Sequence, residues 1–251
     1  MHQPRTLLIL GLALSPAFAA NVVLQNATAT FSQTEFGNFF ASTMIDGSLT
    51  TGVDGWAIFD ANGVTSAQTA VFETVTDQGS AGGTTFTFRM HQLHQISLQH
   101  TVGRFRLSIT TDNRSTFADG LQTGGDVTAT WVILTPLTAS GTNGPTLTVL
   151  GDQSILASGT SPGTSVYTVT AFTPLTAITG IRLEVLEDAS LPTNGPGRAP
   201  SNGNFVVTEF QVDAQGQAPP VIPAPSTWIL MLTALLALAG WQWWRTRPVL
   251  S

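Results

Sequence analysis

Apolar and polar residues alternate along much of the middle of the chain, and this period of two restricts the fold more than any other property of the sequence. In residues 84–91, for example, Phe86, Phe88 and Met90 alternate with threonine, arginine and histidine. The same period recurs in residues 104–110, 127–133, 181–185 and 206–212. Because successive side chains of a strand point to opposite faces of a sheet, each segment predicts a strand with one buried face.

Clusters of glycine, proline and asparagine separate these segments, and no segment between residues 21 and 220 has a helical period. We therefore expect residues 21–215 to form an all-β domain, an antiparallel β-sandwich of the jelly-roll type. Two long connections, residues 112–126 and 188–204, predict loops at the ends of the sandwich. Such loops are either binding sites or mobile surface segments.

The first twenty residues have the three-part order of a secretory signal peptide. Arg5 precedes an apolar run over residues 7–14, and the small residues Ala17 and Ala19 stand just before Asn21. We expect residues 1–20 to form a signal helix that the export machinery recognises and that is removed after transfer across the inner membrane.

A second apolar segment lies close to the C-terminus. Residues 228–244 contain only two polar side chains, Thr233 and Gln242, and therefore predict one transmembrane helix. Tryptophan favours the boundary between lipid and water, and arginine favours the cytoplasmic side of that boundary. The predicted boundary residues are Trp241, Trp243, Trp244, Arg245 and Arg247, and residues 245–251 are the predicted cytoplasmic tail.

A proline-rich linker, residues 216–227, joins the predicted domain to the predicted helix. Its prolines are incompatible with a helix and favour an extended segment. A short motif spans the end of the linker and the first residue of the predicted helix. It consists of Pro223, Ala224, Pro225, Ser226, Thr227 and Trp228. Together with the apolar helix and the arginines, this motif resembles the PEP-CTERM sorting signal of exported bacterial proteins. The family has a glutamate where this chain has Ala224.

The resemblance implies where the chain is sorted. In that family an exosortase-type membrane enzyme recognises the tail, in Gram-negative bacteria that make exopolysaccharide. The chain would first be a membrane-anchored precursor and then a protein of the cell envelope or extracellular matrix. Extracellular polysaccharide is the ligand that this location implies, and the domain would bind it or serve a structural role.

A second resemblance concerns the domain itself. Asp46 is followed by glycine, and Asp54 is followed by glycine and Trp56, which is similar to an early segment of discoidin-like, galactose-binding-type jelly rolls. In that group a calcium ion often joins the loop after the first strand to the last strand. The resemblance implies a structural Ca²⁺ site formed by Asp46, Asp54 and Glu209, because Ca²⁺ prefers oxygen ligands. The alternative is that both Asp-Gly pairs are ordinary turns.

Charge and composition exclude several functions. Residues 21–220 contain all fifteen acidic residues and six of the nine arginines, so the domain has a net charge of −9 and is not expected to bind nucleic acid. The chain has no cysteine, which removes disulfides, thiol catalysis and thiolate metal sites. His91 and His94 are an odd number of residues apart, so on one strand they would point to opposite faces and they do not predict a zinc site.

No catalytic or cofactor-binding residues are predicted, because the chain has no Gly-x-Ser-x-Gly motif and no lysine-containing phosphate loop. The alternative is an exported β-sandwich hydrolase that acts on polysaccharide through paired carboxylates. Glu184, Glu187 and Asp188 are neighbours in the sequence, although a solvated acidic edge explains them equally well. Sugar binding needs an exposed aromatic ring. The alternation places Trp131 in the core, and Trp56 is expected to be a core residue too.

Overall fold

The computed structural model describes residues 19–49, 54–60, 66–96 and 99–219, together with residues 235–238, 241, 242 and 245 near the C-terminus. The described part of the domain consists of strands and three short 3-10 helices. The strands are β1 (Ala20–Asn21), β2 (Leu24–Ala29), β3 (Gln68–Gln78), β4 (Thr84–Gln92), β5 (Arg104–Thr110), β6 (Val132–Ile133), β7 (Pro136–Gly141), β8 (Pro145–Val149), β9 (Ile155–Gly159), β10 (Ser165–Thr173), β11 (Ile178–Val185) and β12 (Glu209–Gly216). The 3-10 helices are η1 (Ala41–Ile45), η2 (Arg114–Thr116) and η3 (Pro192–Asn194).

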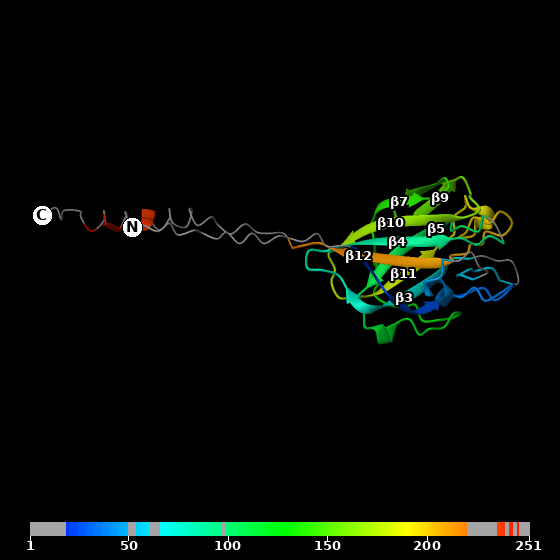
Figure 1. Ribbon diagram of the computed structural model, residues 1–251, viewed down its shortest axis with the longest axis horizontal. Coiled ribbons are helices and arrows are strands. Elements are labelled where there is room, and N and C mark those ends of the chain that lie inside the picture. Colours follow the sequence, from blue (N-terminus) through cyan, green and yellow to red (C-terminus); the bar gives the residue numbers. More distant parts are fainter. Residues whose placement is uncertain are drawn as a thin grey trace, which may run out of the picture. The chain divides into compact units, whose positions relative to one another are not determined.

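The strands form two antiparallel sheets (Figure 1). The first sheet has the order β1-β12-β4-β10-β7, and the second has the order β2-β3-β11-β5-β9-β8, with β6 paired to β5 beyond the end of β9. Apolar side chains from both sheets form one large core between them. This arrangement confirms the prediction of an all-β antiparallel sandwich.

The predicted alternation is correct for the strands at the centre of both sheets. Phe86, Phe88 and Met90 of β4 are buried, and the side chains between them are partly exposed. β5 begins and ends at the predicted residues, and its three apolar side chains are buried. Trp56 is fully buried, as predicted. The period of two therefore identified the core faces of these strands.

The prediction of a strand over residues 127–133 is mostly wrong. Only Val132 and Ile133 pair with β5. Trp131 does not enter the main core; it is half-buried on the outer side of the second sheet, where its ring lies 5.5 Å from the ring of Phe117 and 5.2 Å from the guanidinium of Arg182. A small apolar cluster outside a sheet requires the same alternation as a core strand, so the pattern could not distinguish the two positions.

The last predicted strand starts later than its alternation suggests. Pairing with β4 begins at Glu209, although the prediction placed the strand start at Val206. The backbone N–H groups of residues 206–208 are used elsewhere: Val206 donates to His100, Val207 to Trp56 and Thr208 to His91. This segment is therefore held to His100, to Trp56 and to the end of β4 before it joins the sheet.

Both long predicted loops are fastened to the sandwich. Residues 119–125 lie along the outer edge of β2, where Ala29 donates to Leu121 and Gly125 donates to Ala29. In the second loop Pro196 accepts from Gly103 and Arg198 donates to Thr101. Gly197 lies so close to a later part of the same loop that an added Cβ would be 2.0 Å from the carbonyl oxygen of Asn204. Only glycine permits that approach, so residue 197 lets the two parts of the loop pack against each other.

The chain divides into two compact units, Met1–Ala218 and Pro219–Ser251. In the second unit the described residues 235–238, 241, 242 and 245 are helical, and the guanidinium of Arg245 lies 4.0 Å from the ring centre of Trp241. Among the described residues, no helix has the length and apolar character needed to cross a membrane. Most of the predicted helix at 228–244, including Trp243 and Trp244, lies outside the described residues, as do Arg247, the motif from Pro223 to Trp228 and the signal segment up to residue 18.

Candidate functional site

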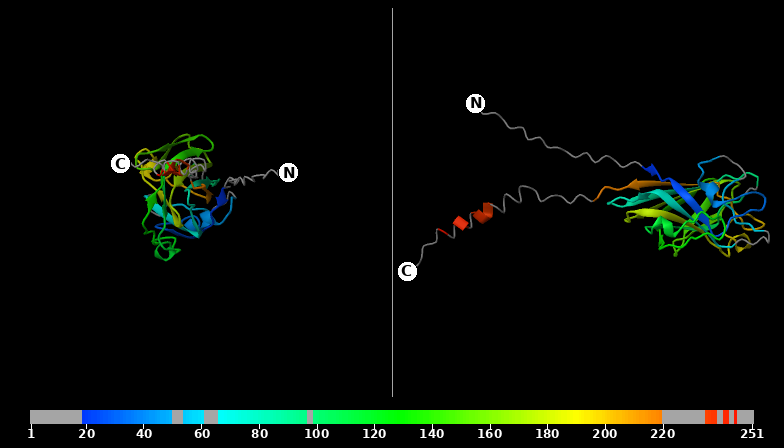
Figure 2. Two further views of the ribbon diagram at one scale, coloured as in Figure 1. Left: turned by 90° about the vertical axis from the view of Figure 1, so that its left-hand side faces the viewer. Right: turned by 90° about the horizontal axis from the view of Figure 1, so that it is seen from below.

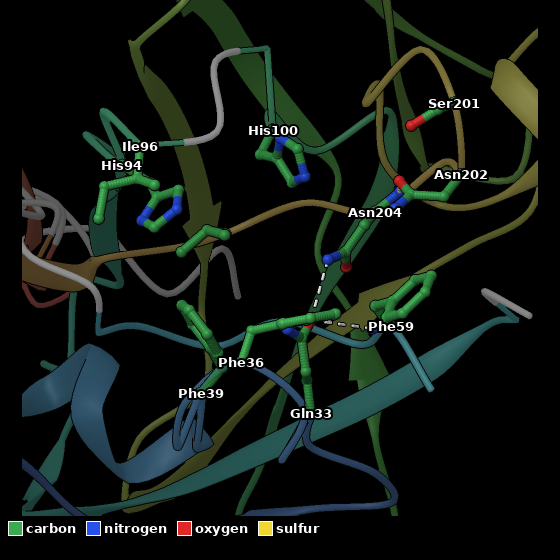
Figure 3. A pocket seen from close by; sticks show the side chains of 11 residues that line it. Gln33, Phe36, Phe39, Phe59, His94, Ile96, His100, Ser201, Asn202 and Asn204 are labelled. Carbon is green, nitrogen blue, oxygen red and sulfur yellow. Dashed lines mark hydrogen bonds between the residues drawn. The ribbon is translucent and has the colours of Figure 1, made fainter. Parts of the chain in front are cut away.

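A pocket of about 340 Å³ lies where the loops at one end of the sandwich meet (Figure 3). β4 ends and β12 begins at this end, and Figure 2 shows the loops from the early and late parts of the chain gathered there. The pocket combines aromatic, amide and imidazole side chains from four separate segments. They are Gln33, Phe36, Phe39, Phe59, His94, Ile96, His100, Ser201, Asn202, Asn204 and Val206.

Two amide side chains in the pocket are held in place by hydrogen bonds. Asn204 Nδ2 donates to Gln33 Oε1 at 3.0 Å, and the Asn204 side chain accepts from the backbone N–H of Ile58 at 3.1 Å. Gln33 Oε1 also accepts from the N–H of Phe59 at 3.3 Å, and its amide nitrogen donates to the carbonyl of Glu35 at 2.7 Å. Both amides are buried, so their orientation is fixed before any ligand arrives.

An exposed aromatic ring stands beside these amides. The side chain of Phe36 is 87% exposed, and its ring lies 6.3 Å from the ring of Phe59. Phe36 has a φ of 64°, which bulky side chains rarely adopt. Such strain persists where the surrounding structure imposes it and is concentrated at functional sites. Ile96, 72% exposed, adds a second apolar side chain to this rim.

Two histidines line the same pocket. The rings of His94 and His100 lie 6.3 Å apart, and His94 also contacts the ring of Phe39 edge-on at 5.8 Å. His91 is separate from them on β4, where its Nε2 lies 3.2 Å from Gln211 Oε1 and where burial lowers its pKa. Across the described ranges, no three His, Asp or Glu side chains come close enough together to hold a metal ion.

The structure brings two of the three predicted calcium ligands together. Glu209 is buried at the start of β12, and its Oε2 accepts from the N–H of Gly47 at 3.2 Å, directly after Asp46. Burial raises the pKa of Glu209 to about 7, with a further increase from the charge of Asp46 and an opposing effect of the Gly47 hydrogen bond. Two neighbouring carboxylates supply part of the oxygen donor set that Ca²⁺ prefers.

Asp54, the third predicted ligand, does not join Asp46 and Glu209 in a three-carboxylate cluster within the described ranges. The next residue, Gly55, would place a Cβ 2.5 Å from the carbonyl of Val207, two residues before Glu209. Loop carbonyls would have to complete a calcium site, since Ca²⁺ takes six to eight oxygens. Residues 50–53, between the two Asp-Gly pairs, lie outside the described part of the chain.

Two of the neighbouring carboxylates near the end of β11 take part in ion pairs and hydrogen bonds. Glu184 accepts from Arg106 Nε at 2.9 Å and lies 3.0 Å from Arg182. Hydrogen bonds from Ser190 lower the pKa of Asp188, with a smaller contribution from Arg104. A general acid for glycoside hydrolysis needs a raised pKa, which is the opposite of what Asp188 has.

Sequence reasoning identified part of the pocket. The loop 188–204 was predicted as a candidate binding loop, and it supplies Ser201, Asn202 and Asn204. Phe36 and the pair His94 and His100 were not predicted as binding residues, because they are far apart in the chain and match no motif.

No protein-family model matches the chain, and no curated protein matches its sequence. The chain is similar to a solved structure described as "Unravelling the multiple functions of the architecturally intricate Streptococcus pneumoniae beta-galactosidase, BgaA". That match has a TM-score of 0.45 and 10% sequence identity, and it covers 80% of this chain and 92% of the other. Similarity at this level identifies neither a family nor a ligand. The fold and the pocket define the class of protein: an antiparallel β-sandwich domain with a pocket between the loops at one end.

Proposed function

We propose that this chain is an exported carbohydrate-binding protein and that the loop-end pocket binds one or more sugar units of an extracellular polysaccharide. The observation that carries the proposal is the exposed ring of Phe36 beside two buried amides, Gln33 and Asn204, whose orientation is already fixed. A sugar presents an apolar C–H face and several hydroxyl groups. The Phe36 ring covers the apolar C–H face, and the amide groups form hydrogen bonds with the hydroxyl groups.

Replacing Phe36 with alanine is expected to weaken binding of an oligosaccharide by about tenfold, because the ring supplies the apolar surface that the sugar covers. The ligand would first be found on a glycan array that includes bacterial exopolysaccharides, and its affinity then measured by calorimetry. Leu137→Ala is the matched control, because Leu137 is also exposed but lies on β7, outside the pocket lining. Equal affinities for both variants would contradict the proposal, and so would the absence of any glycan ligand.

The two ends of the chain supply the proposed location. Residues 1–20 would direct export, and residues 216–251 would act as a PEP-CTERM-type signal that an exosortase processes in the inner membrane of a Gram-negative bacterium. The domain would then reach the envelope or the extracellular matrix. The support is the order of the three tail segments: the motif at residues 223–228, the apolar residues 228–244 and the arginines after them.

Ala224→Glu is expected to increase the fraction of processed chain several-fold, because it restores the glutamate of the family motif. Deleting residues 223–228 is expected to leave the full-length precursor in the membrane fraction. Both variants would be followed by blotting cell fractions with an antibody to the domain, and the unchanged chain is the reference. Full-length protein confined to the cytosol would contradict export and sorting together.

We also propose that a structural Ca²⁺ is held by Asp46 and Glu209, with oxygens of the neighbouring loops completing its coordination. The support is the convergence of Asp46 and Glu209, which joins the segment after η1 to the first residue of the last strand. The ion would compensate two like charges that otherwise repel each other.

A further inference from the structure

One long segment of the chain has almost no charged residues. From Val127 to Ile181 the chain contains a single charged residue, Asp152, although the domain as a whole has a net charge of −9. This segment includes all of β6, β7, β8, β9 and β10. Two copies of an acidic domain repel each other least where few charged residues meet, so an edge strand within this segment is where a second copy can approach.

β8 is the edge strand in this segment, and some of its backbone groups form no hydrogen bond with the described part of the chain. Leu150 donates its N–H to Ser154, which sets the alternation of hydrogen-bonded pairs along β8 and β9. Thr146 and Thr148 therefore direct their backbone groups toward β9, and Leu147 and Val149 direct theirs away from the sheet. The hydrogen bonds on the other side of β9 agree with this alternation. Ala157, which lies opposite Leu147, donates its N–H away from β8, to the carbonyl of Gly103 just before β5.

The other sheet edges are protected. The loop 119–125 covers β2, and β1 is only two residues long. β7 has an irregularity in its pairing with β10. β8 has a proline at its first residue and no charged side chain, and the segment around it exposes apolar side chains: Val132, Ile133, Leu137 and Val149. An open edge of this kind is a template for another strand.

We propose that two copies of this chain pair through β8 in an antiparallel arrangement, so that the second sheet continues from one copy into the other. A two-fold axis through Thr148 places Leu147 opposite Val149 of the second copy. The N–H and carbonyl groups of Leu147 and Val149 in each copy then bond to Val149 and Leu147 of the other copy, which gives four hydrogen bonds. A register centred on Leu147 would place Val149 opposite Pro145, which has no N–H.

The side chains fit this register as well as the backbone does. Leu147 and Val149 lie on the same face as the buried Ile155 and Ala157, and Leu147 already packs against the core. The cross-copy pair of Leu147 and Val149 therefore extends the apolar layer between the sheets, which stabilises cross-strand pairing. Thr148 of one copy faces Thr148 of the other on the outer surface.

The absence of cysteine allows a direct test with the full-length chain in mild detergent. In the proposed register, residue 148 forms a non-hydrogen-bonded pair with its copy, with Cα atoms about 4.5 Å apart, which a disulfide can span. Thr148→Cys is therefore expected to form a disulfide-linked dimer on oxidation with copper phenanthroline, at least about tenfold faster than the exposed β9 control Ser158→Cys. Equal rates for the two variants would overturn the proposal.

A second pair of variants separates pairing from folding. Val149→Lys in the Thr148→Cys chain is expected to reduce the crosslinking rate by about tenfold, because each copy then buries a charge in the interface. The matched control is Val75→Lys in the same chain, because Val75 is similarly exposed on β3. Thermal unfolding of both variants checks that each one is folded. Crosslinking unaffected by Val149→Lys would overturn the proposal, and so would a crosslink formed only with a different protein in a cell extract.

Discussion

Trp56→Ala is expected to lower the free energy of unfolding by about 3 to 5 kcal/mol, the range found when a large aromatic side chain is removed from a core. The indole is fully buried, and its Nε1 donates to the carbonyl of Phe31 at 3.0 Å. Its ring also meets that of Phe205 edge-on at 5.2 Å. Alanine would leave a cavity and a carbonyl without its donor, and this loss is a large part of the total stability of a typical domain.

Chemical denaturation followed by circular dichroism measures this effect. Trp131→Ala is the matched control, because it removes the same side chain from a half-buried position outside the main core. We expect it to cost clearly less than Trp56→Ala, because less apolar surface returns to water. If the two variants were equally stable, the assignment of Trp56 to the core and Trp131 to the outer cluster would be wrong.

Adding Ca²⁺ to the metal-free protein is expected to raise its melting temperature by about 5 to 10 °C. A ligand that binds only the folded state contributes about 2.7 kcal/mol when its concentration is a hundred times its dissociation constant. For a domain of this size, each kcal/mol shifts the melting temperature by about 2 to 4 °C. Differential scanning calorimetry with Ca²⁺ and with a chelator measures the shift.

Glu209→Gln is the decisive variant for this site, because it keeps the shape of the side chain and removes its charge. We expect the Ca²⁺-dependent shift to disappear. The pKa of Glu209 is raised to about 7 in the folded state, so the folded protein holds this proton more tightly than the unfolded chain does. The stabilising contribution of that proton is present at low pH and is lost as the pH rises through about 7.

Without calcium at pH 8, therefore, Glu209→Gln is expected to be at least as stable as the unchanged chain. Glu187→Gln is a suitable control, because Glu187 lies outside the predicted site. A calcium shift that survives Glu209→Gln would place the ion elsewhere, and no shift in the unchanged chain would contradict the site.

The central strands were predictable because their environment is simple. β4, β5 and β11 each have one face on the core, so burial alone determines which residues are apolar, and the period of two follows directly. The same rule was wrong for Trp131, because a local cluster around Phe117 also buries alternate side chains. Hydrophobic alternation indicates that a side chain is covered, and it does not indicate what covers it.

The pocket could be predicted only in part because its residues come from distant segments. Gln33 and Asn204 are separated by most of the domain, and their hydrogen bond exists only because the two sheets place both loops at one end. Nothing near Phe36 in the sequence distinguishes it from a core residue, yet its side chain is exposed.

The sequence alone determined the all-β class, the strands at the centre of each sheet and the negative charge of the domain, because these depend on residue type and on spacing along the chain. The predicted signal and sorting segments rest on the same kind of local information. Tertiary structure decided which edge strand is open and which side chains meet in the pocket. Those properties depend on contacts between residues far apart in the chain, and strand order and register set such contacts.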